Sequence, residues 1–216
     1  MKTIEKYKYF GLAIFAIVIF VLGMVFANSL WKNEIIDTET DLDRDTTELR
    51  SMELQLIYLQ SESVKSCDLL ELGLQDTMSD YNENLKKVQN YNSTFNRERY
   101  RLLKKRYVLS GIMYWIFAED LREKCDFNAT TALFFTESLD EESRNECESK
   151  VTDNLDSLKE DYGDGLLVFT VPMEMDLGMA DVLEKQYEVE DVPLLVFNGN
   201  NTISGCPDRE EIEAEL

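Results

Sequence analysis

The longest run of apolar positions lies near the N-terminus of the chain. Residues 10–31 carry no charge and are rich in Ile, Val, Phe and Leu. A helix needs about 20 such residues to cross a bilayer, so the pattern predicts a membrane-spanning helix here. Three lysines precede this segment and acidic residues follow it. Because positive residues stay in the cytoplasm, we expect residues 1–9 to be a cytoplasmic tail and the rest of the chain to be extracytoplasmic.

A cleaved signal peptide is the alternative for this segment. The tripeptide Val25-Phe26-Ala27 resembles a cleavage site. However, the apolar run up to that point is about 18 residues long, beyond the roughly 7–15 of a signal peptide. We therefore favour an uncleaved anchor, and under either interpretation the remaining chain lies outside the cytoplasm.

Residues 32–126 show helical periodicity and predict a stalk followed by an antiparallel hairpin. The stalk pattern is an interrupted heptad: Ile35, Leu42, Leu49 and Leu56, with Met52 and Leu59 at the second core position. It predicts an amphipathic helix over about residues 34–63. Two interpretations are open for this helix. It pairs with itself as a homodimeric coiled coil through residues 35–59, or it packs on the hairpin.

Two further apolar stripes predict the helices of the hairpin, over residues 68–89 and 97–124. The first stripe is Leu74, Met78, Tyr81, Leu85 and Val88, and the second is Tyr100, Leu103, Tyr107, Tyr114, Phe117 and Leu121. Residues 108–118 are apolar on nearly every face. Because this run is too short to cross a bilayer, we expect it to be a buried part of the second helix.

Cys67 and Cys125 flank the predicted hairpin. Cys67 lies 27 residues before the loop centre near Thr94, and Cys125 lies 31 residues after it. Antiparallel helices that rise about 1.5 Å per residue bring the two ends to nearly the same level. The spacing therefore predicts a Cys67–Cys125 disulfide at the base of the hairpin.

Short apolar runs separated by turn residues dominate residues 129–216. The expected strands are residues 131–136, 165–171, 194–197 and 202–204, and the expected helices are residues 147–162, 177–187 and 208–216. The order is βαβαββα, which predicts an α/β domain whose first two strands are parallel. Asn198-Gly199-Asn200-Asn201 predicts the tight turn of the final β-hairpin.

The charge of the chain narrows the classes of function. Charged residues make up 30% of the sequence, the net charge is −21, and there is no histidine. This excludes histidine-based acid–base catalysis and histidine metal ligation. The acidity disfavours nucleic acid as a partner, because phosphates require Lys and Arg, and it disfavours adsorption to anionic lipid. The even number of four cysteines suits disulfides outside the cytosol.

The element order and the Val192-Pro193 dipeptide resemble the thioredoxin fold over residues 129–216. In that family a cis-proline at this position faces the active site, and a hairpin and terminal helix follow. The resemblance implies a substrate groove beside Val192, Pro193 and Gly205, in which an extended peptide binds by its backbone.

The resemblance also implies a C-x-x-C motif before the first helix, and this chain departs from that pattern. Cys147 aligns with the second cysteine, whereas Arg144 stands where the first would fall. The family geometry places Cys206 on the same surface, so we hypothesise a Cys147–Cys206 disulfide. It is either a permanent staple or a relocated redox pair, which makes Cys147 and Cys206 the candidate catalytic residues.

The whole chain also resembles a group of archaeal membrane proteins that have one N-terminal span, a cysteine-bearing helical hairpin and a thioredoxin-like domain. The matching motifs are residues 54–59 (LQLIYL), 67–70 (CDLL), 124–125 (KC) and 162–164 (YGD). This resemblance implies an architecture and a location but no reaction.

Three sequons mark candidate glycosylation sites at Asn92, Asn128 and Asn200, each in an expected loop. Calcium binding by the acidic loop 137–148 lacks the alternation of an EF-hand, so we expect no metal and no cofactor. The leading expectation is a membrane-anchored, non-catalytic binding or scaffold module for an extracytoplasmic protein or peptide. The alternatives are a thiol–disulfide oxidoreductase or isomerase that uses Cys147 with Cys206, and an assembly partner held by residues 35–59.

Overall fold

The computed structural model describes residues 19–20, 23, 67–91, 97–140 and 143–216. The predicted stalk and almost all of the predicted span lie outside these ranges, and so does Asn92. Within them, no helix has the length and apolar character that crossing a bilayer requires. By its contacts the chain divides into two units, Met1–Ser51 and Met52–Leu216, and the elements below belong to the second.

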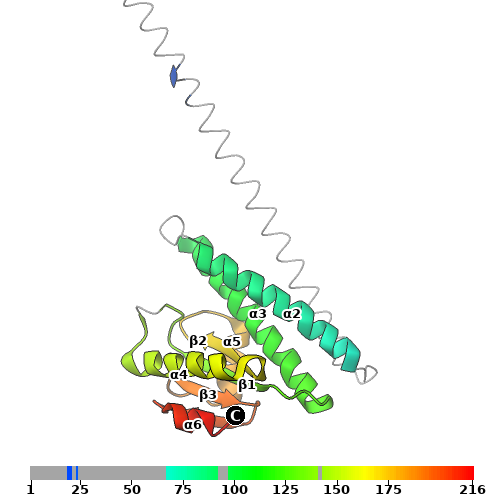
Figure 1. Cartoon of the computed structure of the whole chain (residues 1–216). Coiled ribbons are helices and arrows are strands. Elements are labelled where there is room, and N and C mark those ends of the chain that lie inside the picture. The colour runs from blue at the N-terminus through cyan, green and yellow to red at the C-terminus, as the bar shows by residue number, and fades with distance from the viewer. Residues whose placement is uncertain (1–18, 21–22, 24–66, 92–96, 141–142) are drawn as a thin grey trace, which may run out of the picture. The chain divides into compact units, whose positions relative to one another are not determined.

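The predicted hairpin is present as helices α2 (Cys67–Asn90) and α3 (Arg97–Lys124) (Figure 1). Glycine allows the two helices to approach closely. A Cβ atom on Gly73 would lie 2.6 Å from Cε1 of Phe117, whose ring is fully buried. Any side chain at this position would therefore collide with a ring that has no room to move.

The buried face of α2 agrees with the predicted stripe only in part, because Leu74 and Tyr81 pack against the core but the most buried residues are others. The structure buries Leu70, Gly73, Thr77 and Asn84, whereas Met78 is 41% exposed. The interface includes small residues and polar residues that are hydrogen-bonded. For example, the Asn84 amide donates to Ser110 Oγ at 3.3 Å. A stripe of large apolar residues alone could not locate an interface of this composition.

The C-terminal region forms a mixed four-stranded sheet. Its strands are β1 (Thr130–Thr136), β2 (Leu166–Pro172), β3 (Leu194–Phe197) and β4 (Asn201–Ser204), in the order β2-β1-β3-β4. The β1–β2 pair is parallel, and the β1–β3 and β3–β4 pairs are antiparallel. This confirms the predicted parallel pair and final hairpin, although β4 begins one residue earlier than expected.

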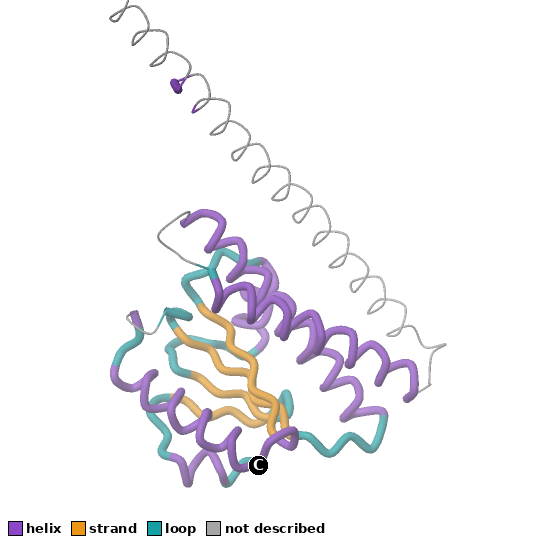
Figure 2. The backbone as a smooth tube through the Cα atoms, turned by 45° about the horizontal axis from the view of Figure 1, so that its top comes forward, coloured by secondary structure: helices purple, strands orange, loops and turns teal. Residues whose placement is uncertain are grey.

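Helices cover both faces of this sheet (Figure 2). On one face lie α4 (Glu146–Tyr162) and α6 (Arg209–Glu213), whose apolar residues form one core with Phe134, Leu195 and Phe197. On the other face lie α3 and α5 (Gly178–Gln186). Helix α6 is shorter than the helix predicted over residues 208–216. A 3₁₀ turn at Gly163–Gly165 connects α4 to β2.

Helix α3 is the central element, because it packs on two sides. Tyr114 and Trp115 belong to the core shared with the sheet, whereas Phe117 and Leu121 pack with Leu70 of α2. A helix between two apolar layers must be apolar on both faces. This confirms the expectation that residues 108–118 are buried and explains their uniform hydrophobicity.

Candidate functional site

One edge of the sheet gathers the residues that the sequence singled out. The register pairs Thr136 with Pro172, and it places Leu194 beside both Phe135 and Ser204. The β1–α4 loop, the segment before β3 and the segment after β4 therefore meet at the carboxyl end of the parallel pair. Ligand sites in open α/β sheets lie at this kind of edge.

A disulfide joins two of these segments. Cys147 and Cys206 are bonded, with their Cα atoms 5.3 Å apart, which confirms the hypothesised pair. Cys147 is the second residue of α4, and Cys206 lies exposed two residues after β4. The bond therefore ties the start of the first helix of the sheet region to the end of its last strand.

The predicted groove residues lie beside this disulfide. The Val192–Pro193 peptide bond is cis, as the resemblance implied. The Pro193 carbonyl accepts a hydrogen bond from Gly205 N at 3.0 Å, next to Cys206 in the chain. Gly205 has φ 84°, a conformation that favours glycine. Gly205 and Cys206 are exposed at this place, whereas Pro193 is buried beneath them and is linked to Gly205 by this hydrogen bond.

The backbone of Val192 has no hydrogen-bond partner among the residues that the structure describes. None of the backbone hydrogen bonds among the described residues involves Val192, which lies outside every strand. Its side chain packs on the core shared by α3 and the sheet, and the residue is half-buried. Its N–H and C=O are therefore held on a fixed backbone with no partner from the described chain.

Glu148 is a buried carboxylate that the sequence reasoning did not single out. It follows Cys147 directly and is 0% exposed. Its carboxylate accepts hydrogen bonds from Glu137 N at 2.5 Å, from Thr136 Oγ1 at 2.8 Å and from Asn145 N at 3.1 Å. The signal that predicts this role is the capping box, in which Asn145 precedes Glu148 by three residues.

These hydrogen bonds keep Glu148 ionised. Burial raises the pKa of this carboxyl, but the donors at Glu137, Thr136 and Asn145 and the charge of Arg144 together outweigh burial and lower the pKa below its usual value. The carboxylate is thus held as an anion in the interior of the domain, one residue after Cys147 in the chain.

Basic side chains brace the loops at the same edge. Arg144, which stands where the family pattern has its first cysteine, donates to the carbonyls of Ser138 and Leu139 at 3.3 and 3.0 Å. Helix α3 reaches the same region, because Lys104 pairs with Asp140 at 2.6 Å and Lys105 donates to the Asp176 carbonyl at 2.6 Å. The hairpin therefore supports both loops that follow the parallel strands.

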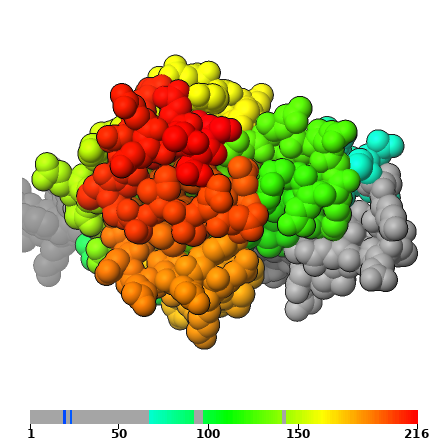
Figure 3. All heavy atoms as spheres, turned by 90° about the horizontal axis from the view of Figure 1, so that it is seen from below, coloured from blue at the N-terminus to red at the C-terminus, as the bar shows by residue number. Residues whose placement is uncertain are grey.

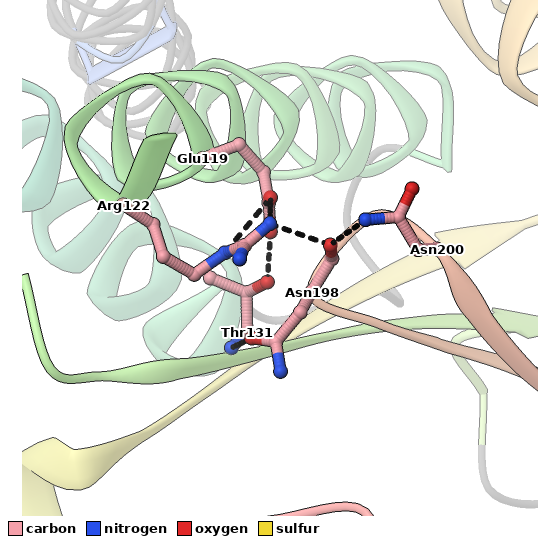
Figure 4. A network of polar contacts seen from close by, with 5 residues as sticks. All are labelled: Glu119, Arg122, Thr131, Asn198 and Asn200. Carbon is pink, nitrogen blue, oxygen red and sulfur yellow. Dashed lines mark hydrogen bonds and ion pairs between the residues drawn. The ribbon is translucent and has the colours of Figure 1, made fainter. Parts of the chain in front are cut away.

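The opposite edge of the sheet is closed by a polar network (Figure 4). Arg122 contacts the Glu119 carboxylate at 2.7 Å and the Asn198 carbonyl at 2.6 Å, and Thr131 Oγ1 donates to Glu119. Thr131 and Asn198 also exchange hydrogen bonds through N–H groups and oxygens. Figure 3 shows the surface of α3 and its following loop against the β3–β4 hairpin. This contact joins the base of the helical hairpin, at the end of α3, to the sheet.

The remaining sequence predictions lie away from the disulfide edge. The Cys67–Cys125 disulfide is formed, with a Cα–Cα distance of 5.9 Å. Asn128 and Asn200 are both exposed in loops, and their glycosylation stays a prediction. Across the described ranges, no three His, Cys, Asp or Glu residues are placed to hold a metal ion.

No family model and no curated protein matches this chain. What the geometry defines is a disulfide-stapled α/β domain that combines a mixed four-stranded sheet with a helical hairpin. Its four cysteines are all bonded. Two disulfides are typical of an oxidising, extracytoplasmic environment.

Proposed function

We propose that the region from β1 to the C-terminus is a thioredoxin-like domain. Three features support this: the strand order β2-β1-β3-β4 with a parallel first pair, helices on both faces, and a cis-proline before β3. The domain is carried outside the cytoplasm by the predicted N-terminal span, so the membrane is its first partner. The group of archaeal membrane proteins that the chain resembles has the same plan.

The function that this site supports best is the binding of an extended protein or peptide segment, in a scaffold role. The observation that carries the proposal is the backbone of the half-buried Val192, which makes no hydrogen bond within the described residues and lies close in the fold to the closed Cys147–Cys206 disulfide. An extended segment that pairs with this backbone adds main-chain hydrogen bonds without rearranging the domain. Its side chains would contact Gly205 and Cys206, which are both exposed.

The chemistry of the site favours binding over thiol catalysis. A catalytic cysteine needs an electropositive surrounding that stabilises its thiolate. Cys147 is instead preceded by Glu146 and followed by the ionised Glu148, and the C-x-x-C motif is absent. The bond is therefore a staple that shapes the groove.

The binding proposal is tested by titrating the isotope-labelled chain with short unstructured peptides and following its amide NMR signals. We expect the largest shift at Val192, with smaller shifts at Gly205 and Cys206. The matched control is the same peptide N-methylated at its central residue, which lacks the donor for backbone pairing and should lose binding. Shifts that cluster elsewhere, or that survive N-methylation, would exclude this groove.

A thiol–disulfide exchange activity is the second candidate, and one observation favours it. Cys206 is exposed, and Cys147 lies in the first turn of α4, where the helix dipole favours a thiolate. A substrate thiolate would attack Cys206, releasing Cys147 as a thiolate. A second substrate thiol would resolve the mixed disulfide, so that the substrate is oxidised by two electrons and the Cys147–Cys206 pair is reduced.

A redox titration separates the two candidates. A reduction potential of about −200 mV for the Cys147–Cys206 pair supports exchange, whereas one below about −300 mV is that of a structural disulfide. Rapid oxidation of a dithiol peptide that disappears in the C147S/C206S variant would overturn the staple interpretation.

A further inference from the structure

The positive charge of this acidic chain is concentrated in one place. Eight of the 22 Lys and Arg residues lie between positions 86 and 106, with Glu98 as the single acidic residue among them, although the chain carries a net charge of −21. The eight are Lys86, Lys87, Arg97, Arg99, Arg101, Lys104, Lys105 and Arg106. This segment is therefore locally basic, although the chain as a whole is acidic.

These residues lie at the tip of the helical hairpin, which we define as the last two turns of α2 and the first three turns of α3. The tip is at the opposite end of the hairpin from the Cys67–Cys125 disulfide. Lys104 and Lys105 are used inside the molecule, where they hold Asp140 and Asp176. Lys86, Arg97 and Arg101 are exposed, and the two arginines are one turn apart on the same face of α3.

Aromatic and aliphatic side chains accompany the charges. Leu102, next to Arg101, is 43% exposed. Tyr91 and Tyr100 stack with ring centroids 6.1 Å apart, and Arg99 and Lys104 lie over their faces. Lysine and arginine combined with tyrosine and an exposed leucine are typical of surfaces that lie in the interface of a bilayer. A purely electrostatic contact with a protein or a soluble polyanion would not require the leucine.

The acidic helices do not share this surface. Helices α4 and α6, which include many of the carboxylates, pack on the face of the sheet opposite α3. The tip can therefore approach an anionic surface while α4 and α6 remain in solvent.

We propose that the hairpin tip docks on the anionic lipid headgroups of a bilayer. Lys86, Arg97 and Arg101 pair with phosphates, and Leu102 enters the interfacial layer. This would orient the domain, directing α4 and α6 away from the membrane. The inference does not depend on what the groove beside Val192 binds.

The test uses the full chain in nanodiscs, with a tryptophan reporter at the tip. The W31F/L102W variant leaves only the buried Trp115 as background. In nanodiscs that contain phosphatidylglycerol and brominated lipid, we expect reporter quenching at least about twofold stronger than in pure phosphatidylcholine, and we expect high salt to remove the difference. Equal quenching in both lipids, or none, would overturn the proposal.

Charge reversal sharpens the test. R97E/R101E in the reporter chain should lower the ratio of docked to undocked tips at least about thirtyfold. The matched control K150E/K185E reverses two exposed lysines away from the tip and should leave the quenching unchanged. Equal loss in both variants would mean that net charge and not the tip is responsible. Salt-sensitive self-association abolished by R97E/R101E, without a lipid effect, would assign the tip to a second copy and exclude lipid.

A separate measurement tests whether the predicted N-terminal span anchors the chain in the membrane. Carbonate extraction reports whether the chain is integral to the membrane. If carbonate extracts it, flotation of the same chain with phosphatidylglycerol or phosphatidylcholine vesicles replaces the nanodisc measurement. Flotation with the anionic vesicles alone, lost in R97E/R101E, then supports the docking proposal, and no flotation overturns it.

Discussion

The two disulfides close loops of nearly equal length and lie in different surroundings. Their sequence separations are 58 residues for Cys67–Cys125 and 59 residues for Cys147–Cys206. The first closes the base of the helical hairpin beside Leu121 and Leu70. The second lies at the sheet edge beside a cis-proline, an unpaired backbone and a buried carboxylate. Because the two disulfides close loops of nearly equal length, a difference between their contributions to stability must come from the residues around each bond.

The largest expected effect is the loss of either disulfide. Chain entropy alone gives about 4 kcal/mol for loops of this length, so C67S/C125S and C147S/C206S should lower the free energy of unfolding by similar amounts. Chemical unfolding of both variants measures the difference. If one costs much less than the other, the native surroundings and not the loop decide the contribution of that bond.

Glu148 provides the next test, because it is specific to the sheet edge. Replacement by glutamine in E148Q removes a buried charge that accepts three hydrogen bonds, and it should cost about 2 kcal/mol. The matched control is E211Q, since Glu211 has the same capping-box role in α6 but is exposed. A similar cost for both would show that capping, and not the buried contacts, explains the role of Glu148.

The same residue predicts a pH dependence. The pKa of Glu148 is lowered in the folded chain, so the stabilisation is present above the unfolded pKa of about 4.3 and is lost as the pH falls through the folded pKa. Unfolding measured across the acid range should show this loss in the parent chain and less of it in E148Q. Parallel curves would contradict the assignment.

A smaller effect is expected at the hairpin interface. In G73A the new Cβ meets the buried ring of Phe117, which costs about 1–3 kcal/mol, whereas alanine regains about 1 kcal/mol of helix propensity. The net loss should therefore be at most about 2 kcal/mol in thermal or chemical unfolding. Gly178 in α5 has no atom within 4 Å of its Cβ position, so G178A should be neutral or stabilising.

The smallest expected effect is at the polar network on the other sheet edge. R122Q removes a partly buried ion pair and one hydrogen bond to Asn198, and we expect a loss of about 1 kcal/mol. The control R209Q removes the more exposed pair with Asp161, which should contribute less because solvent screens it. If the two losses match, the network does not hold the hairpin to the sheet.

Local patterns predicted the elements well because each has a local physical cause. The boundaries of α3 follow from its apolar stripe and its flanking turns, and the predicted 97–124 agrees with the structure. The turn at Asn198 and Gly199 was predicted from residues that tolerate positive φ, and both have it, at 51° and 70°. Helical rise alone was enough to predict the Cys67–Cys125 pair.

The candidate site was predicted only in part. The pairing of Cys147 with Cys206 and the cis-proline followed from a resemblance in element order. Glu148 was missed, because a glutamate near the start of a helix usually faces solvent. It is buried here only because α4 packs against the end of β1, where Thr136 donates to the carboxylate. The buried face of α2 was also predicted only in part: Leu74 and Tyr81 pack against the core as expected, whereas the glycine, threonine and asparagine that complete the interface carry no hydrophobic signal.

The sequence by itself determined the order and type of the elements, since turn residues, apolar periods and caps act within a few positions. It also determined the uneven charge, which is visible in the lysines and arginines near the hairpin tip. Only the tertiary structure decided that Gly73, Thr77 and Asn84 complete the buried face of α2 and that Glu148 is an ionised carboxylate in the interior. It also decided that the Val192 backbone makes no hydrogen bond within the part of the chain that the structure describes. Those properties depend on contacts between segments far apart in the chain, whose desolvation and hydrogen bonding no local pattern specifies.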